Sequence, residues 1–459
     1  MTQGAARDWL DANSGAALDT LRRFCAIPSV STDPAYLPAM AAAAAFLCAH
    51  LTAIGLEHAR VQPTGGHPVV SADWLHAPGA PTLLIYGHYD VQPPDPVALW
   101  HSPPFEPAVR DGRLYARGVS DDKGPVMVAL TAIAALIATA TLRVNLRLLL
   151  EGEEEIGSRN LEAFVVAHAA EWQADWVLSA DGAMWRADLP SITVASRGLC
   201  ALDVTLTGAA KDLHSGRHGG MVANPLAAMA RLLAGLHTDD GAIAVPGFLD
   251  AVRPIAPATR AAVAAIPFDE ADYRAQVGAP ALAGEAGFST LERNWLRPTL
   301  ELNGLNGGYA GSGTKTVIPS TAHAKITCRL VPDQDPAIVA ALIEADLRRR
   351  CPPGVTLAVE HHPGHATPYA ARDDHSGLLL AERVLHRLDG QAPLRVRMGA
   401  TIPIGEVFQR VLGLDTIFFS FSTADEDYHA PNEFFRLARW EAGLRAWVDY
   451  LDGAAGWRA

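Results

Sequence analysis

Several features that define other classes of protein are missing from this 459-residue sequence. It has no long run of basic residues, and its formal net charge of −13 argues against nucleic-acid binding. The five cysteines form no CxxC pair, which predicts reduced thiols in a cytoplasmic protein rather than a disulfide framework. The absence of a Gly-x-Ser-x-Gly motif leaves a serine hydrolase without support.

Targeting and membrane signals are also weak. The first residues lack a basic start followed by an apolar core, so we expect an amphipathic helix rather than a signal peptide. Residues 126–142 are apolar, but the stretch is short for a membrane span and lies close to Asp121, Asp122 and Lys123. We therefore predict a buried helix there and no membrane partner.

The length favours two domains. Residues after 197 change in texture: 201–207 and 324–330 alternate polar and apolar side chains, which is typical of a sheet with one solvated face. Before this point and again from about 369, the pattern is that of a buried α/β sheet. It predicts a helix after Gly124 and strands at 69–74, 82–86, 144–150 and 176–179. We predict an α/β first domain, residues 1–196 and 367–459, with a second domain, residues 197–366, inserted into it.

Acids and histidines follow the apolar segments of the first domain. His88 and Asp90 come just beyond an expected strand, and a metal-bound imidazole commonly donates its other N–H to a carboxylate. Asp121 precedes the apolar helix. Further candidates, each also near the end of an expected element or in a polar loop, are Glu154, Glu155, Asp181 and His429.

Each of these residues has an ordinary structural alternative. Asp121 could cap the helix, Asp181 could form an Asp-Gly turn, and His429 could be a surface histidine. The four carboxylates of residues 151–155 could be a solvated loop, although repulsion between them would be relieved by cations. As a set, oxygen and imidazole ligands without thiolate suit zinc, manganese or cobalt.

These segments resemble the M20 family of dinuclear metallopeptidases, in particular its carnosinase-type branch of cytosolic nonspecific dipeptidases. The resemblance covers nearly the whole chain and includes the ordered motifs YGHYDVQP, GVSDDKGP, EGEEEIGS, SADGAMW, KDLHSGRHGG, GTKTVIPS, CRLVP, GATIPI and HAPNE. It implies a zinc-peptidase-like mixed-sheet catalytic domain with an inserted α+β lid and dimerisation domain. An Asp at position 181 resembles dipeptidases and aminopeptidases, whereas many deacylating members have Glu.

The resemblance also implies a role for each matched residue. His88 and Asp181 would bind one divalent metal ion, Glu155 and His429 a second, and Asp121 would bridge the two. The metal expected first is zinc, with manganese or cobalt as alternatives.

Other matched residues would serve catalysis and substrate binding. Asp90 would brace His88, and Glu154 would be the general base. His214 would act in trans, across a homodimer, to stabilise the oxyanion. Arg329 would hold the carboxylate of the substrate. The residues implied to line the same pocket are His365, whose match needs a small gap, and Thr401.

The function implied is hydrolysis of dipeptides or short peptides by a metal-bridging hydroxide, with Glu154 accepting its proton. An amidohydrolase that removes the acyl group from N-acyl amino acids could use the same site. A binding protein that kept the fold without catalysis is a third possibility. No presumed metal ligand departs from the family pattern, which favours an active enzyme.

Overall fold

The computed structural model describes residues 2–457 of the chain. Its contacts divide the described residues into two compact units. The first takes those within Met1–Val194, Ala371–Val396 and Ile404–Ala459, and the second takes Ala195–Ala370 and Arg397–Pro403. The insertion predicted from the sequence comprised residues 197–366 and did not include residues 397–403. This segment joins the second unit through tertiary contacts that no local pattern announces.

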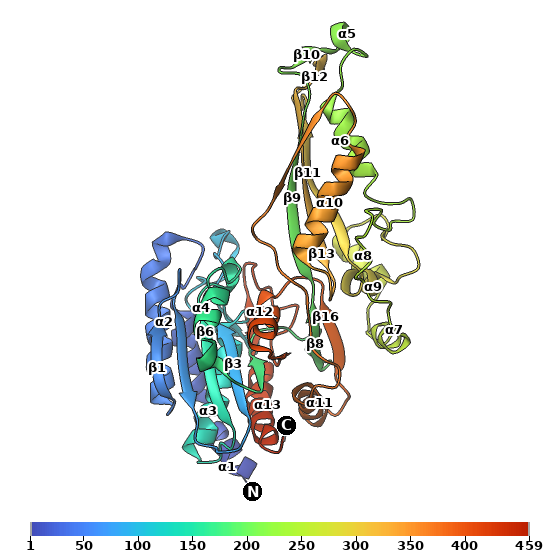
Figure 1. The fold of residues 1–459 in the computed structure, drawn as a ribbon. Helices are drawn as coiled ribbons and strands as arrows, with labels where there is room; N and C mark the ends of the chain where they lie inside the picture. The colour runs from blue at the N-terminus through green and yellow to red at the C-terminus, as the bar shows by residue number, and fades with distance from the viewer. Residues whose placement is uncertain (1, 458–459) are drawn as a thin grey trace. The chain divides into compact units, whose positions relative to one another are not determined.

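A twisted mixed sheet forms the centre of the first unit (Figure 1). Its strands lie in the order β1-β2-β6-β3-β7-β17-β8, and β16 also pairs with β8. β3 is parallel to both β6 and β7, and β17 is parallel to β7. The bounds are β1 Glu57–Gln62, β2 Val69–Trp74, β3 Thr82–His88, β6 Asn145–Glu151, β7 Trp176–Ser179, β8 Ser191–Ser196, β16 Leu394–Met398 and β17 Thr416–Phe418. The predicted strands at 69–74, 82–86, 144–150 and 176–179 are confirmed, with β3 reaching two residues further, to His88.

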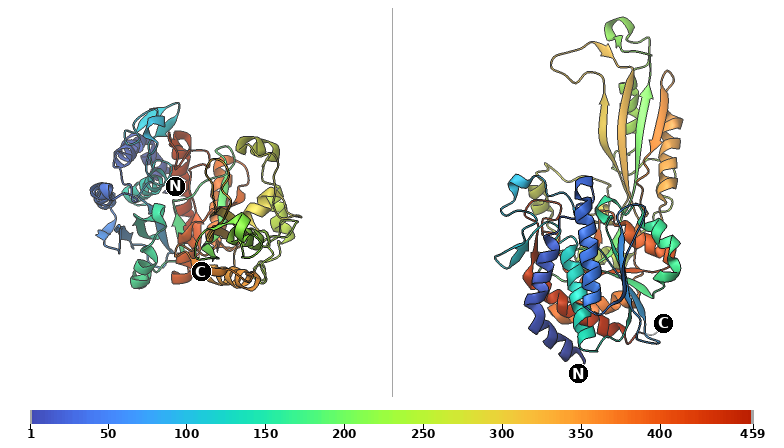
Figure 2. Two further views of the ribbon diagram at one scale, coloured as in Figure 1. Left: turned by 90° about the horizontal axis from the view of Figure 1, so that it is seen from above. Right: turned by 90° about the vertical axis from the view of Figure 1, so that its left-hand side faces the viewer.

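Helices cover this sheet and share one hydrophobic core with it. α1 packs against α3, α3 packs against α13, and Figure 2 shows the blue α1 beside the teal α3. The helices of this unit are α1 Thr2–Cys25, α2 Leu37–Ala53, α3 Lys123–Ala138, α4 Leu161–Ala167, α11 Ser376–Asp389, α12 Pro403–Leu412 and α13 Leu437–Ala454. A small separate sheet is formed by β4 Ala108–Arg110, β5 Arg113–Tyr115 and β18 Phe434–Arg436.

Two apolar helices of this unit bear on the question of a membrane. The stretch predicted as a buried helix is α3, which is buried from Lys123 to Leu136. A different segment, Pro34–Ala53, is long and apolar enough by composition to cross a membrane. Its α2 part packs Met40, Leu47 and Leu51 into the core, as a core helix of a globular unit does.

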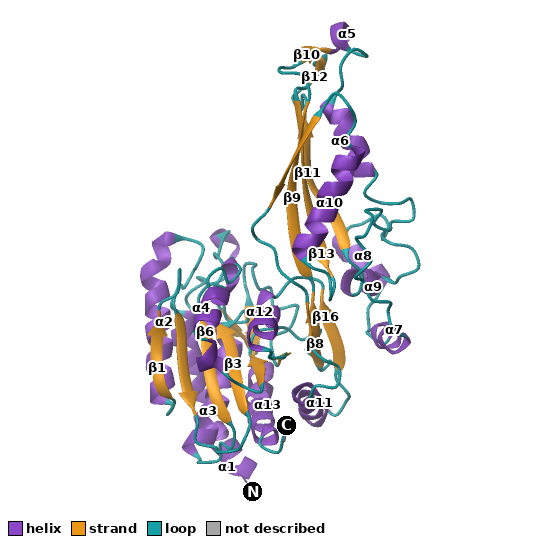
Figure 3. Ribbon diagram, viewed as in Figure 1, coloured by secondary structure: helices purple, strands orange, loops and turns teal. Residues whose placement is uncertain are grey.

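The second unit is an antiparallel sheet with helices on one face (Figure 3). The strand order is β11-β13-β9-β14, and α6 and α10 pack on β9 and β13 to close a second core. Along β9 every second residue is buried, as the sequence alternation predicted. The strands are β9 Gly198–Thr207, β11 Thr299–Gly307, β13 Thr321–Leu330 and β14 Thr356–His361. Two short strands, β10 Leu213–His214 and β12 Val317–Ile318, pair with each other, and β15 Tyr369–Ala370 pairs with the end of β8.

The remaining helices of the second unit follow from local sequence. α6 Pro225–Ala234 and α10 Pro336–Arg350 both begin with proline after a capping side chain, Asn224 and Asp335 respectively. The Pro- and Ala-rich region after residue 251 contains the short helices α7 Pro257–Ala264, α8 Glu270–Val277 and α9 Thr290–Trp295. Another short helix, α5 Ser215–His218, lies before this region.

Candidate metal centre

The parallel strands of the first unit deliver polar side chains to one edge of the sheet. His88 is the last residue of β3 and is paired with Glu151, the last residue of β6. Asp181 lies two residues beyond β7, whose Ser179 is in register with Tyr86 of β3. Because the carboxyl ends of parallel strands meet at the same edge, residues far apart in sequence come together there.

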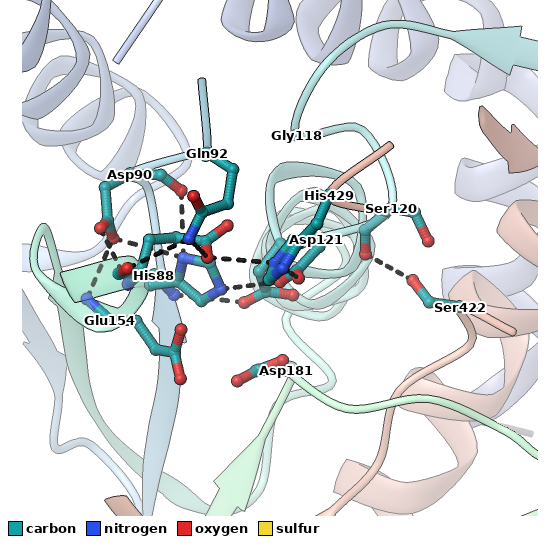
Figure 4. A network of polar contacts seen from close by, with 12 residues as sticks. His88, Asp90, Gln92, Gly118, Ser120, Asp121, Glu154, Asp181, Ser422 and His429 are labelled. Atoms are coloured by element: carbon teal, nitrogen blue, oxygen red, sulfur yellow. Dashed lines mark hydrogen bonds and ion pairs between the residues drawn. The ribbon is translucent and has the colours of Figure 1, made fainter. Parts of the chain in front are cut away.

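Asp121 lies at the centre of this cluster, as Figure 4 shows. Its Oδ1 is 3.0 Å from Nε2 of His88, and its Oδ2 is 2.9 Å from Nε2 of His429. The same His429 nitrogen is 3.1 Å from Oε2 of Glu155. The helix-capping alternative for Asp121 is therefore not what the structure has: Asp122 occupies the N-cap of α3, and it makes no side-chain capping bond.

Two groups of potential metal ligands result, and they share one residue. His88, Asp121 and Asp181 form the first, and Asp121, Glu155 and His429 form the second. Within each group the ligand atoms lie within 4.8 Å of one another. Imidazole nitrogens and carboxylate oxygens without thiolate suit zinc, manganese or cobalt, so the donor set fits a pair of divalent cations.

Asp90 holds both the histidine and the acids in place (Figure 4). Its side chain is fully buried, and its Oδ1 is 3.3 Å from Nδ1 of His88. The same carboxylate accepts the backbone N–H of Glu154 at 3.2 Å and of Glu155 at 3.1 Å. One carboxylate thus orients the imidazole and also fixes the short 3-10 turn, Glu154–Ile156, that carries both acids.

Glu154 differs from its neighbours because its carboxylate makes no hydrogen bond to the described chain. Figure 4 shows it directed to the same side as the Asp181 carboxylate. Glu155, by contrast, contacts His429 and accepts a 2.8 Å bond from Nε2 of Gln92. Of these two adjacent acids, Glu155 is held among the potential metal ligands, whereas Glu154 is held through its backbone N–H.

Charge within the cluster is strongly redistributed. Burial lowers the pKa of His88, but its bonds to Asp121 and Asp90 outweigh burial and raise that pKa well above its ordinary value. Bonds to Asp121 and Glu155 raise the pKa of His429 to about 10. Burial raises the pKa of Asp181 to about 6 and that of Glu154 well above its ordinary range. So many acids in one buried place retain protons unless other positive charge is supplied, which is the electrostatic condition for cation binding.

The residues expected to bind substrate lie in the second unit. Nη1 of Arg329, in β13, donates a 2.7 Å hydrogen bond to Oγ1 of Thr401. His365 is exposed in the loop between β14 and β15. His214 is exposed at the end of β10, where its Nδ1 accepts the backbone N–H of Gly216. The structure thus brings Arg329 and Thr401 into contact, while the functional roles expected for all four residues remain predictions.

Two residues that support the cluster were not anticipated as site residues. Gln92 lies within the YGHYDVQP motif, so its place in the motif was the available signal. Glu433, in HAPNE, is fully buried and accepts hydrogen bonds from Nη1 of Arg117 and from the backbone of Gly118, Ser120 and Asp121, at 2.7, 2.7, 2.8 and 3.2 Å. It fixes the loop that presents Asp121. Its position in the same motif as the expected ligand His429 was the available signal.

The geometry indicates a site that could hold divalent cations, and comparison with known proteins shows the class to which the chain belongs. Residues 84–453 match Peptidase family M20/M25/M40. The chain therefore belongs to this family, and it is a hydrolase of peptide bonds.

Similar proteins extend over nearly the full chain. The Cys-Gly metallodipeptidase of Schizosaccharomyces pombe is 30% identical, covering 96% of each chain. The Beta-Ala-His dipeptidase of Mus musculus is 30% identical over 94% of this chain and 91% of its own. Among solved structures, an M20 family metallo-carboxypeptidase from Sulfolobus solfataricus superposes with a TM-score of 0.83 at 30% identity, covering 96% of this chain and 99% of that one. Human carnosine dipeptidase 1 gives 0.76 at 28%, with 99% of both chains covered.

The buried position of Glu433 generates a stability prediction. In Glu433→Gln an amide N–H₂ replaces one of two acceptor oxygens that face N–H donors. We expect a loss of about 1–3 kcal/mol in the free energy of unfolding, because buried donors lose their acceptor. Urea denaturation measures it. The exposed Glu441→Gln on α13 is the matched control, and equal unfolding free energies for the two variants would contradict the role given to Glu433.

Proposed function

We propose that the protein is a dipeptidase whose active site is the two-group cluster of the first unit. The observation that carries the proposal is that Asp121 belongs to both groups, with one carboxylate oxygen facing each histidine. A carboxylate with this arrangement is suited to bridge two cations. The names of the similar proteins, which describe hydrolysis of Cys-Gly and β-Ala-His, support a dipeptide as substrate.

Each residue of the cluster has one part in holding the cations. His88 and Asp181 would hold one, Glu155 and His429 the other, and Asp121 both. Zinc is the metal expected first, with manganese or cobalt as alternatives. When bound, such a pair of cations polarises the scissile carbonyl and lowers the pKa of a water molecule towards neutrality.

Glu154 is proposed as the general base. Its carboxylate lies beside the ligands without a hydrogen-bond partner in the described chain, while its backbone N–H is fixed by Asp90. A base must be held at the site and yet be free to take a proton. Glu154 accepts the proton of the attacking water and returns it to the amine that leaves.

Arg329 is proposed to receive the C-terminal carboxylate of the dipeptide, because a guanidinium binds a carboxylate in a bidentate fashion. Thr401 already accepts one of its N–H groups. His365 would contribute from the neighbouring loop. These assignments favour short peptides with a free carboxyl end.

His214 is proposed to act across a homodimer, with the second unit as lid and dimerisation domain. It is exposed at the end of β10, and its Nδ1 accepts the backbone N–H of Gly216. A neutral imidazole with Nδ1 as acceptor carries its proton on Nε2, where it can donate to a developing oxyanion.

Removal of an acyl group from N-acyl amino acids is the alternative activity, since the same cluster would serve it. A free amino group at the N-terminal residue distinguishes dipeptides from these compounds. The dipeptidase names of the similar proteins favour the former.

Chelation followed by metal repletion tests the function. We expect the chelated protein to hydrolyse none of Cys-Gly, β-Ala-His and Ala-Ala, and zinc, manganese or cobalt to restore cleavage, because the cluster requires cations for its chemistry. Release of free amino acids is measured. N-acetyl-alanine is the comparison substrate, and faster turnover of it than of every dipeptide would establish the deacylase instead.

The base assignment leads to a second prediction. Glu154→Gln keeps the shape and the backbone bond to Asp90 but cannot accept a proton, so kcat should fall by about 100-fold or more. Metal content, measured by elemental analysis, should stay at the wild-type level because Glu154 is not a proposed ligand. Near-normal turnover with metals bound would exclude Glu154 as the base. The exposed Glu441→Gln serves as control.

Catalysis across a dimer is tested by mixing two impaired variants. His214→Ala and Glu154→Gln subunits, exchanged at equal ratio, should recover about a quarter of wild-type activity, because half of the dimers then contain one complete site of two. Mixing Glu154→Gln with Asp121→Asn is the control and should recover nothing, since both changes lie in the first unit. If the two mixtures recovered equal activity, His214 would not act in the active site of the partner subunit.

A further inference from the structure

Two arginines of the second unit approach the same short loop. Arg197 directly precedes β9, and Arg329 lies in β13, where it is paired with Leu199. Nε of Arg197 donates a 2.7 Å hydrogen bond to the carbonyl of Gly399, and Nη1 of Arg329 donates one of 2.7 Å to Thr401. Both guanidiniums therefore meet the 399–401 loop.

Arg197 is incompletely satisfied. Its exposed fraction is 7%, and its Nη1 is buried with no hydrogen-bond partner among the described residues. A guanidinium has five N–H donors, and leaving one buried without an acceptor costs stability. Such a group in a folded protein calls for an explanation, and an acceptor supplied by a ligand is one.

The positive charge of Arg197 and Arg329 is a second observation. Within residues 2–457 no carboxylate forms an ion pair with Arg197 or Arg329. Burial, together with the positive charge of Arg329, lowers the pKa of Arg197 to about 10, and Glu301 opposes this from a distance. Two like charges close together and partly removed from water repel each other unless an anion lies between them.

A purely structural role for Arg197 is the competing explanation. Besides the Nε bond, its backbone N–H donates a 3.0 Å bond to the carbonyl of Ala400. These two contacts would hold the loop without any ligand. They use only one of the five guanidinium donors, however, and they give no reason for placing a second positive charge beside Arg329.

We propose that Arg197 is a substrate-binding residue that acts with Arg329 as a two-guanidinium receptor for the C-terminal carboxylate of the dipeptide. This inference rests on the proposed function and adds a second cation to the carboxylate site. Two guanidiniums can surround both oxygens of one carboxylate, so the site selects free acids over C-terminal amides, which carry no negative charge at that end.

The test compares the dipeptide that the wild type cleaves fastest, among Cys-Gly, β-Ala-His and Ala-Ala, with its C-terminal amide. In Arg197→Gln we expect kcat/KM for the free acid to fall by about 10- to 100-fold, mainly through KM, because one charge-assisted hydrogen bond is lost. The amide, which never used the charge, should change little, so the acid-to-amide preference falls with the acid. Arg197→Lys keeps the charge but not the planar fork and should lie between the two.

Lys325→Gln is the control: it removes one exposed positive charge from β13, the strand of Arg329, where Lys325 pairs with Asp203, and it should leave the preference unchanged. Thermal unfolding of every variant reports whether the fold is kept, and Arg197→Lys provides the comparison if Arg197→Gln is unstable. Equal losses on acid and amide, or no acid preference in the wild type, would overturn the inference while the dipeptidase assignment stands. Absence of any hydrolysis by the metal-replete wild type would instead overturn the proposed function.

Discussion

The shared carboxylate of Asp121 is the interaction on which the rest of the site depends. Its two oxygens face two histidines that are separated by more than three hundred residues in the chain. Without this residue, His88 with Asp181 and Glu155 with His429 would be two unconnected pairs of groups. With it they form two adjacent groups around one side chain, which is the arrangement that two neighbouring cations require.

Two buried carboxylates that are not proposed metal ligands hold Asp121 and its neighbours in position. Glu433 accepts hydrogen bonds from backbone N–H groups of the loop before α3, and Asp90 accepts them from the turn after β6. Both carboxylates are buried, and both are satisfied mainly by backbone N–H donors. Side chains anchored in this way lose little entropy when a ligand binds, because they are already ordered.

The two units carry opposite chemistry. In the first unit, acids converge at the end of a parallel sheet, and burial together with their mutual repulsion raises the pKa of Glu154 and Asp181, so the cluster is suited to bind cations. In the second, Arg197 and Arg329 form no ion pair with a carboxylate among residues 2–457, and the pair is proposed to bind an anion. A dipeptide presents a polarisable carbonyl and a terminal carboxylate, which are the two features that the proposed sites would bind.

The strands and buried helices of the first unit could be predicted because apolar runs of five to seven residues have few alternatives once Gly and acids bound them. β3 and α3 are examples, and the alternation of β9 likewise identified a half-solvated sheet. The ordered motifs identified the family, and with it the residues expected to bind metal, since ligand types and their order survive in the sequence itself.

Other features depended on the tertiary structure alone. The local sequence could not tell whether Asp121 caps α3 or faces two histidines, because an aspartate just before a helix is compatible with either role. The pairing of β3 with β6 and β7, which positions His88, is a tertiary feature. The local sequence also could not place residues 397–403 in the second unit or set Arg197 beside Arg329. Which side chains share a site depends on contacts between distant segments. Local periodicity, which reports only whether a residue is buried or exposed, contains no information about them.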